Sequence, residues 1–553
     1  MTTTYEEDLQ PLDPARRRVL IGTLAAAGTS LLGMDAVEAV AAAPAADRAL
    51  RERIKTIVVI YAENRSFNNL FAQFPGQAQP LADLTRVRAA QRDRNGAPLP
   101  QLPKIWGGLV PQPQTVGGTR YVIDEGQITG LPNAPFRLAD AAGKPLPLGV
   151  MTRDLTHRFY QNQMQINGGR NDQFVAWGDS GALVMGHYGP ESGALKLAEV
   201  ARRYVLCDRF FMSAFGGSWM NHIFLISAQP PFVADAKTGP VKRLICEIEG
   251  DDPKGTRLKL RKDSPASALD GPPRFERDGT LTPDGFAVNT MAPPYQPSYV
   301  KPAPGGDPAL ADPRNPGVLP PQDDATIGDR LSAKGISWAW WSGAWAATLA
   351  HEGQQGDGAV PNFQEHHQPF NYYRNYAPGT AARAEHLRDA GLGDDAKTNH
   401  FLAAIDAGKL PAVSFYKPQG NLNMHAGYAD VASGDAHIAH VIERLEKSPQ
   451  WADMVVIVTT DENGGWWDHV SPPEGDRWGP GTRIPAIVVS PHAKKGVVDH
   501  TDMDTNSILR LITRVHGLEP LPGVKRRDDA MRARGQVLLG DLTSALELGM
   551  SVG

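Results

Sequence analysis

The sequence has few cysteines, no large excess of charge of either sign, and no apolar run long enough to span a membrane. Its 553 residues include 2 cysteines, and 56 Lys and Arg stand against 61 Asp and Glu, for a net charge of −5. This balance argues against a protein that binds nucleic acid through its overall charge. Cys207 and Cys246 allow either one disulfide, if the chain is exported, or two buried free thiols, and both readings stay open.

The chain also lacks a three-residue glycine period and any internal repeat, although it contains 56 glycines and 46 prolines. The missing period excludes a collagen-like fibre. Overall disorder is excluded because hydrophobic residues make up 41% of the chain, with 11 Trp, 13 Tyr and 17 Phe available for a large core. The length suits either about three domains of ~150 residues or one α/β domain with long insertions.

The first 46 residues have the features of an export signal. Three arginines at 16–18 precede an apolar run of sixteen residues at 19–34, and small residues at 41–46 offer cleavage sites. A membrane-spanning helix needs about twenty apolar residues, so the run is short for that role. We expect a twin-arginine-like signal peptide over 1–46 and a bacterial periplasmic or secreted protein, without stable membrane insertion once the signal is removed. The alternative is a short anchor that stays attached.

Short β-branched runs alternate with amphipathic segments along the rest of the chain. Strands are predicted at 54–61, 204–207, 413–416, 454–460 and 487–490, and helices at 153–166, 436–447 and 506–516. This alternation predicts an α/β fold with a mostly parallel central sheet flanked by helices. Two stretches, about 73–150 and 231–330, are rich in Gly and Pro and show little periodicity. We therefore predict a single domain over 47–553, with these stretches as loop insertions that form a cap.

Two acidic pairs follow two of the predicted strands directly. Glu63-Asn64 follows the first strand, and Asp461-Glu462 follows the strand at 454–460. Ligands of open α/β sheets bind at the carboxyl ends of the strands. Three carboxylates gathered there repel one another unless a cation neutralises them, so the pairs predict a metal site of hard oxygen ligands. The alternative is that strand ends are simply polar and that Asp461 or Glu462 caps a helix.

A third motif is Gly216-Gly217-Ser218, which opens an apolar helical run with Asn221 one turn further on. A serine in this place caps the helix, and the helix start favours an anion. A hydroxyl nucleophile, a side-chain donor and an anion-binding helix start are what phosphoryl transfer needs. An ordinary N-cap in front of a core helix is the alternative.

Several histidines lie close to these motifs. His157 falls on the predicted helical stretch at 154–166, and His425 falls in a loop rich in Gly and Asn after a predicted strand. His366 and His367 are adjacent, and His469 follows the Asp461 pair. Imidazoles can bind phosphate oxygens, donate a proton to a leaving group or bind a metal ion, so their proximity to the other motifs makes them candidate site residues.

These segments together resemble the bacterial phosphoesterase family that unites acid phosphatases with phospholipases C. The family is related in fold to alkaline phosphatases, sulfatases and phosphoglycerate mutases. The matching segments occur in the family's order over about 63–473: Glu63-Asn64-Arg65-Ser66-Phe67, Asn167-Gly168-Gly169, Gly217-Ser218 with Asn221, Met424-His425, Asp461-Glu462-Asn463-Gly464-Gly465, Asp468-His469-Val470 and Pro472-Pro473. The phospholipase branch usually has Gly-Pro-Thr with Asn-Arg at the third motif, so Gly217-Ser218 and the 366–370 segment look like the acid phosphatase branch.

The resemblance implies a metal-dependent acid phosphatase that hydrolyses small-molecule phosphate monoesters through a phosphoserine intermediate on Ser218. It implies one divalent ion, with Ca, Mg, Mn, Zn or Fe as candidates, and it implies residues around the phosphoryl oxygens. The implied metal ligands are Glu63, Asn64, Asp461, Glu462 and Ser218 Oγ, and the implied phosphoryl contacts are His157, Asn221, His366, His367 and His425. Either His367 or His425 would protonate the leaving oxygen.

Two other functions compete with this interpretation. One is a phospholipase C or broader phosphodiesterase of the same family, which would act on phospholipid headgroups. The other is a non-catalytic exported binding protein, which a missing nucleophile or ligand would indicate. Cationic histidines would favour an anionic substrate below about pH 6.5, which predicts an acidic optimum. No nucleic-acid partner is expected, and the oligomeric state is left open.

Overall fold

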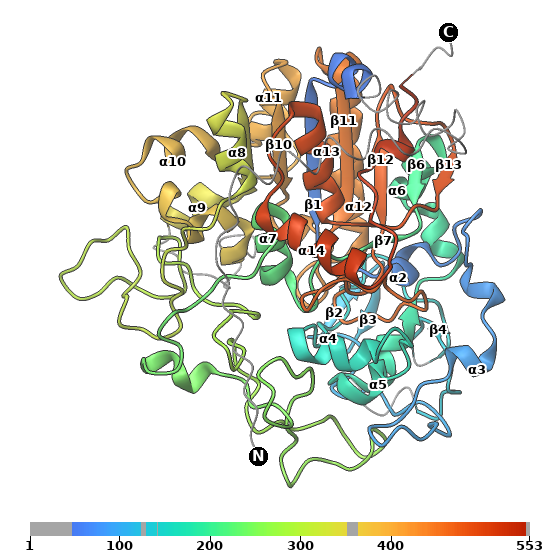
Figure 1. Ribbon diagram of the computed structural model, residues 1–553. Coiled ribbons are helices and arrows are strands. Elements are labelled where there is room, and N and C mark those ends of the chain that lie inside the picture. The colour runs from blue at the N-terminus through green and yellow to red at the C-terminus, as the bar shows by residue number, and fades with distance from the viewer. Residues whose placement is uncertain (1–46, 123–128, 141, 351–362, 549–553) are drawn as a thin grey trace, which may run out of the picture. The chain divides into compact units, whose positions relative to one another are not determined.

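Runs of β-branched and aromatic residues build an eight-stranded sheet at the centre of the computed structural model (Figure 1). The strands follow in the spatial order β13 (Val497–Asp499), β6 (Val205–Cys207), β12 (Ala486–Val489), β11 (Met454–Thr460), β1 (Thr56–Ala62), β10 (Val413–Lys417), β8 (Trp338–Gly343) and β9 (Leu387–Gly391). Neighbouring strands are parallel except at β12, which is antiparallel to both β11 and β6. The predicted α/β fold with a mostly parallel sheet is therefore confirmed.

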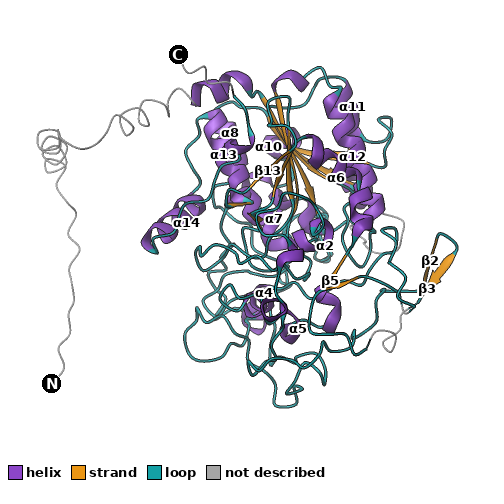
Figure 2. Cartoon of the chain, turned by 90° about the vertical axis from the view of Figure 1, so that its right-hand side faces the viewer, coloured by secondary structure: helices purple, strands orange, loops and turns teal. Residues whose placement is uncertain are grey.

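Helices cover both faces of the sheet, which explains why its central strands are mostly apolar and fully buried. Figure 2 shows the two groups on opposite sides of the strands. One group contains α6 (Lys196–Arg203), α11 (His400–Asp406) and α12 (Val431–Glu446). The other group contains α7 (Ser218–Ser227), α8 (Ile327–Ala333) and α13 (Asn506–His516).

The remaining elements are short or lie outside these two layers. The helices are α2 (Phe67–Phe71), α3 (Arg86–Ala89), α4 (Phe159–Ile166), α5 (Phe174–Trp177), α9 (Trp345–Ala350), α10 (Ala381–His386) and α14 (Pro522–Ala533). Three small pairs of strands are β2 (Gln114–Val116) with β3 (Thr119–Tyr121), β4 (Phe136–Arg137) with β5 (Gly186–His187), and β7 (Phe210–Phe211) with β14 (Met503–Asp504). The loops of the two predicted insertions lie at the end of the sheet where β1 and β11 finish (Figure 1).

The structure describes residues 47–122, 129–140, 142–350 and 363–548, of which Arg53–Glu547 form one compact unit. The predicted export signal at 1–46 lies outside the described residues. Within them, no helix combines the length and apolarity needed to cross a bilayer. Cys207 and Cys246 are separate, buried thiols, and burial raises the pKa of Cys246 to about 12.

Strand β11 and helix α13 match their predicted bounds, but the helix predicted over 153–166 is wrong in its first half. Helix α4 begins only at Phe159, and the preceding segment runs without regular structure. The reason is tertiary: Arg153 N donates to Leu109 O over 2.9 Å and Thr156 N to Asp179 Oδ1 over 3.1 Å. These bonds replace the helical ones, so His157 lies before the helix and not on it.

Candidate active site

The register of the two central strands brings the acidic pairs together. Ala62 of β1 pairs with Thr460 of β11 in parallel, so Glu63 and Asp461 leave the sheet side by side. Asp461 Oδ1 accepts hydrogen bonds from the backbone N–H groups of Asn64 at 3.1 Å and Glu462 at 2.8 Å. Glu63, Asp461 and Glu462 are all fully buried. No described helix begins at Asp461 or Glu462, so the alternative that they cap a helix is wrong.

At these strand ends the backbone adopts left-handed conformations, and the two chain segments approach each other closely. Asn64 has φ 58°, and Gly464 has φ 59°, both in the left-handed region. A Cβ added at Gly464 would lie 2.4 Å from Asn64 O, so a residue with a side chain does not fit there. Gly464 N donates to Glu462 Oε2 over 2.6 Å, which fixes that carboxylate. The glycine thus lets the two chain segments approach closely enough to share one site.

Ser218 is the first residue of α7, and its hydroxyl faces the acidic pairs. The N-cap is Gly217, and Ser218 Oγ donates to Asn64 Oδ1 over 3.1 Å, with Glu462 Oε1 at 3.4 Å. The expectation that Ser218 caps the helix is therefore wrong. Gly216 has φ 100°, and a Cβ there would lie 2.8 Å from Phe159 N, so this turn packs directly against the segment that carries His157.

Asn221 lies one turn further along α7, but its amide is bonded to the backbone of the turn. Its Oδ1 accepts from Ala214 N at 3.0 Å, and its Nδ2 donates to the carbonyl oxygens of Ala214 and Gly217, each at 3.2 Å. The side chain is fully buried. In this arrangement Asn221 holds the turn that presents Ser218.

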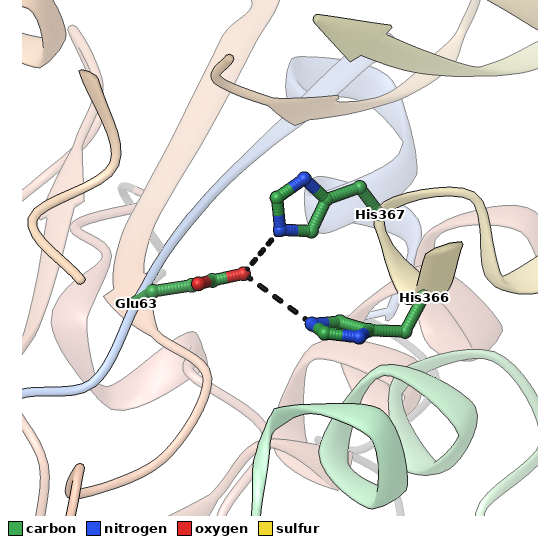
Figure 3. A group of neighbouring side chains, drawn as sticks. All are labelled: Glu63, His366 and His367. Carbon is green, nitrogen blue, oxygen red and sulfur yellow. Dashed lines mark ion pairs between the residues drawn. The ribbon is translucent and has the colours of Figure 1, made fainter. Parts of the chain in front are cut away.

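Three histidines converge on Glu63. His367 Nε2 lies 2.7 Å and His366 Nε2 3.7 Å from Glu63 Oε1, and Figure 3 shows both rings directed at the carboxylate. They sit on the short 3-10 helix Glu365–His367. His425 Nε2 lies 3.8 Å from the other oxygen, Oε2. The structure thus brings together histidines that are far apart in the sequence around one strand-end carboxylate.

Sequence reasoning missed two further partners of Glu63. Lys417, the last residue of β10, is fully buried and its Nζ forms an ion pair with Glu63 Oε1. The Tyr428 hydroxyl donates to Glu63 Oε2 over 2.7 Å. A signal for Lys417 was available, because a charged residue directly follows the apolar run at 413–416. Tyr428 offered no such signal.

His157 approaches the site from the other side. Its Nε2 lies 3.3 Å from Asn64 Nδ2 and 3.8 Å from Glu462 Oε1. Its Nδ1 lies beside the carbonyl oxygen of Leu155, which leaves Nε2 to face the site. Burial disfavours the imidazolium, but the charges of Glu462 and Asp154 outweigh burial and raise the pKa of His157 to about 9.

Burial has the opposite net effect on the other histidines. It lowers the pKa values of His366 and His425, and it lowers the pKa of His367 to about 3. The expectation of several cationic histidines therefore applies only to His157 among these four. Near neutral pH, His157 is therefore positively charged, and His366, His367 and His425 are neutral.

The three buried carboxylates have shifted pKa values, and the shifts differ in direction. Burial, followed by the charge of Glu63, raises the pKa of Asp461 to about 6, and burial raises that of Glu462 well above its ordinary value. Burial also acts on Glu63, but Lys417 and His367 outweigh it and hold its pKa well below the ordinary range. Buried carboxylates that disfavour their own ionisation in this way are typical of a cation site.

The donor set fits a divalent ion. Asp461 Oδ2 is buried and has no hydrogen-bond donor among the described residues, and His222 Nδ1 is 3.6 Å away. Glu63, His222 and Asp461 each offer a ligand atom within 4.8 Å of the others, as do Glu63, His366 and His367. Carboxylate, amide and hydroxyl oxygens from Asp461, Asn64 and Ser218 add the hard oxygen donors that such ions prefer.

A cavity of about 710 Å³ lies beside the first residues of α7. Ser218, His157, His366 and His425 line it, whereas Glu63, Asn221 and His367 do not. Residues of both predicted insertions also form its walls, namely Gly107, Pro111, Val288, Asn289 and Thr290. The insertions therefore contribute directly to the space that a substrate would enter.

Two motifs of the family pattern lie outside this cavity. Asp468 Oδ1 accepts from the buried Arg483 Nε over 3.0 Å. His469 is bonded through its two ring nitrogens to Asn68 Oδ1 and Gln79 O. Asn167 ends α4 in the left-handed region, with φ 49°. These residues hold neighbouring segments of the chain in place.

Comparison with known proteins supports a phosphoester site. The sequence model of the phosphoesterase family matches residues 54–519. Phospholipase C A of Mycobacterium tuberculosis is 23% identical over 89% of this chain and 77% of its own length. Non-hemolytic phospholipase C of Pseudomonas aeruginosa is 22% identical over 96% of this chain and 62% of its own.

Two solved structures align with parts of this chain. A protein of the alkaline phosphatase superfamily from Vibrio parahaemolyticus aligns with a TM-score of 0.30 and 10% identity over 68% of this chain and 72% of its own. The murine ectonucleotide pyrophosphatase/phosphodiesterase 5 aligns with a TM-score of 0.27 and 9% identity over 59% of this chain and 90% of its own.

Proposed function

Because the chain belongs to the phosphoesterase family, and is thus a phosphoric ester hydrolase, we propose that it is a metal-dependent acid phosphatase that uses Ser218 as its nucleophile. One observation carries this proposal: the Ser218 hydroxyl lies at the wall of the cavity, held by Asn64 Oδ1 at 3.1 Å. A residue placed in this way borders the space that a substrate would enter, and its hydroxyl is fixed in direction, as a nucleophile needs to be.

The residues that would hold the ion are Glu63, Asn64, Asp461, Glu462 and Ser218. The buried Asp461 Oδ2 without a donor and the raised pKa values of Asp461 and Glu462 support this assignment. When bound, a divalent ion would lower the pKa of the serine hydroxyl and offset the charge of the phosphoryl group.

The first step transfers the phosphoryl group to the protein. Ser218 Oγ attacks phosphorus and gives up its proton, for which Glu462 Oε1 at 3.4 Å is an available acceptor. The bond from phosphorus to the ester oxygen breaks, and that oxygen takes a proton as the alcohol leaves. The product is a phosphoserine at position 218.

We assign His425 as the proton donor to the leaving oxygen. It lines the cavity, whereas His367 is fully buried against Glu63. Its Nδ1 lies beside the carbonyl oxygen of Ala426, which leaves Nε2 to carry the transferred proton. In the second step a water molecule gives a proton to His425 and attacks phosphorus, the bond to Oγ breaks, and the serine proton returns.

The phosphoryl oxygens would be bound mainly by His157 and His366. His157 carries a positive charge, and His366 lines the cavity with its Nε2 3.7 Å from Glu63 Oε1. We assign Asn221 an indirect part, because its amide is bonded to the turn that presents Ser218. An acidic optimum remains a prediction of this scheme, since protonated His425 is needed as the donor.

A phospholipase C or phosphodiesterase activity is the second candidate. It is favoured by the two relatives described above, which are both named phospholipases C and align over most of this chain. The cavity volume of about 710 Å³ also leaves room for a group larger than phosphate beside Ser218. Such an activity would use the same nucleophile and the same ion.

The two candidates are separated by one comparison of rates. The intact protein is assayed from pH 4 to 9 on a chromogenic phosphate monoester and on the matching diester, and its metal content is measured in parallel. A higher kcat/KM for the monoester, with an acidic optimum and a phosphoserine trapped by acid quench, supports the acid phosphatase. Preference for the diester selects the second candidate, and no turnover of either ester by metal-loaded protein contradicts both.

The location and organisation of the chain also remain proposals. We propose that residues 1–46 are removed on export to the periplasm or outside the cell, and that the rest is one domain capped by its insertions. The compact unit Arg53–Glu547 and the insertion residues in the cavity wall support the second point. N-terminal sequencing of the mature protein from its native host tests the first, because an intact residue 1 would contradict removal.

A further inference from the structure

Lys417 is the one lysine that is buried within the described residues, and it points into the proposed metal site. It ends β10, next to β1 in the sheet, and its exposed fraction is 0%. Its Nζ contacts Glu63 Oε1 and lies 5.8 Å from the centre of the Tyr61 ring. Desolvating an ammonium group is costly, so its presence needs a compensating partner, and Glu63 is that partner.

Glu63 is also shared by two of the three groups of candidate metal ligands among the described residues, and the third group is Asp154, His157 and His425. It groups with His222 and Asp461 on one side, and with His366 and His367 on the other. Figure 3 shows the second cluster, in which both histidine rings face the Glu63 carboxylate. His366 Nε2 is buried, lies 3.7 Å from Glu63 Oε1, and has no hydrogen-bond partner among the described residues. Ligand atoms for two ions are therefore present around one carboxylate.

The ammonium group of Lys417 occupies the Glu63 oxygen that faces the histidine cluster. Two cations on one carboxylate oxygen repel each other strongly in a buried site. We propose that Lys417 is a built-in cation of the metal site, which takes the place of a second metal ion at Glu63 and keeps the single divalent ion weakly enough bound to exchange. The inference rests on the metal site of the proposed function, and it adds a residue that sets the number and affinity of ions.

This role predicts a direction that a merely structural role does not. If Lys417 only supports the fold, its removal loosens the site and weakens metal binding. If Lys417 competes with the ion for Glu63, its replacement by an uncharged residue of similar length strengthens metal binding. We expect the Mn²⁺ dissociation constant of Lys417→Met to be at least about tenfold lower than that of the wild type.

The test is a titration of the metal-free full-length protein with Mn²⁺ at pH 8, with free Mn²⁺ counted by its electron paramagnetic resonance signal. The control is Lys409→Met, which removes an exposed lysine shortly before β10 and should bind Mn²⁺ like the wild type. Circular dichroism confirms that each variant is folded. Equal or weaker binding by folded Lys417→Met overturns the proposal.

The wild type provides a second test that does not depend on how the variant folds. It should bind one Mn²⁺ per chain at saturation, and two bound ions would overturn the role of Lys417. No bound ion would instead contradict the metal site of the proposed function. One ion in the wild type without tighter binding by the variant removes the inference alone and leaves the proposed function intact.

Discussion

Ser218 Oγ donates a hydrogen bond to Asn64 Oδ1 over 3.1 Å, although the two residues are 154 positions apart in the chain. Asn64 follows β1, and Ser218 begins α7. Because Oδ1 accepts this bond, Asn64 Nδ2 is directed at His157 Nε2, 3.3 Å away. The Asn64 amide thus holds the hydroxyl of the proposed nucleophile, and His157 lies beside that amide.

Replacing the nucleophile should abolish turnover without unfolding the protein. For Ser218→Ala we expect kcat on a chromogenic monophosphate to fall by on the order of 10³-fold or more, because the attacking oxygen is removed. The matched control is Ser213→Ala, five positions before Ser218, which removes a buried hydroxyl that has no hydrogen-bond partner among the described residues. Ser218→Ala that keeps more than a tenth of the wild-type rate would remove Ser218 as nucleophile.

Neutralising the central carboxylate should cost the protein its metal. Asp461→Asn removes a negative charge whose oxygen Oδ2 has no hydrogen-bond donor among the described residues. We therefore expect metal content by elemental analysis to drop well below the wild-type level. Asp453→Asn, an exposed position just before the other end of β11, is the control and should keep its metal. Wild-type metal content in Asp461→Asn would show that the ligand assignment is wrong.

Removing the amide of Asn221 should damage the turn before α7. Asn221→Ala leaves Ala214 N without its acceptor and removes one donor from each of the carbonyl oxygens of Ala214 and Gly217. We expect the free energy of unfolding to fall by about 1–3 kcal/mol and kcat to fall with it, because buried polar groups lose their bonds and Ser218 loses its support. Urea denaturation and steady-state kinetics measure the two effects. The exposed Asn421→Ala serves as control, and a variant with lower activity but unchanged stability would instead indicate direct contact with substrate.

Acid should destabilise the protein partly through His516, the last residue of α13. Burial, with the charges of Lys334 and Lys55, lowers the pKa of His516 to about 4, below the ordinary value of about 6.5. Between these values the unfolded chain binds a proton that the folded chain does not, so stability is lost as pH falls from about 6.5 to about 4.

This prediction is tested by urea denaturation of the wild type and of His516→Gln, with the midpoint of each measured at pH 7.5 and at pH 5. The variant should lose less stability on acidification than the wild type, because the group that takes up the proton on unfolding is gone. His400→Gln, at an exposed position in α11, controls for the substitution itself. An equal loss in wild type and His516→Gln would contradict the assignment.

Much of the candidate site could be predicted from the sequence, for a physical reason. Parallel strands end at the same edge of a sheet, so polar residues directly after two apolar runs must lie near one another. Glu63 and Asp461 were recognised in this way, and the paired register of β1 and β11 places them side by side. The Gly216-Gly217-Ser218 turn was recognisable too, because glycine marks a tight approach of the backbone.

Other parts of the site could not be predicted, because they depend on partners from distant segments. The bonds of Arg153 and Thr156 to Leu109 and Asp179 keep His157 off the helix that its local sequence favours. The amide of Asn221 is bonded to its own turn and does not reach the cavity. Lys417 reaches Glu63 only because β10 lies beside β1.

The sequence by itself determined the α/β class, the strand-end carboxylates and the serine at a glycine turn, since each depends on local pattern and on the common direction of parallel strands. The tertiary structure alone decided which groups carry charge. Burial makes His366, His367 and His425 poor bases, whereas Glu462 and Asp154 keep His157 protonated. A pKa depends on the depth of a group and on its neighbours in space, and neither of these can be read from the order of residues.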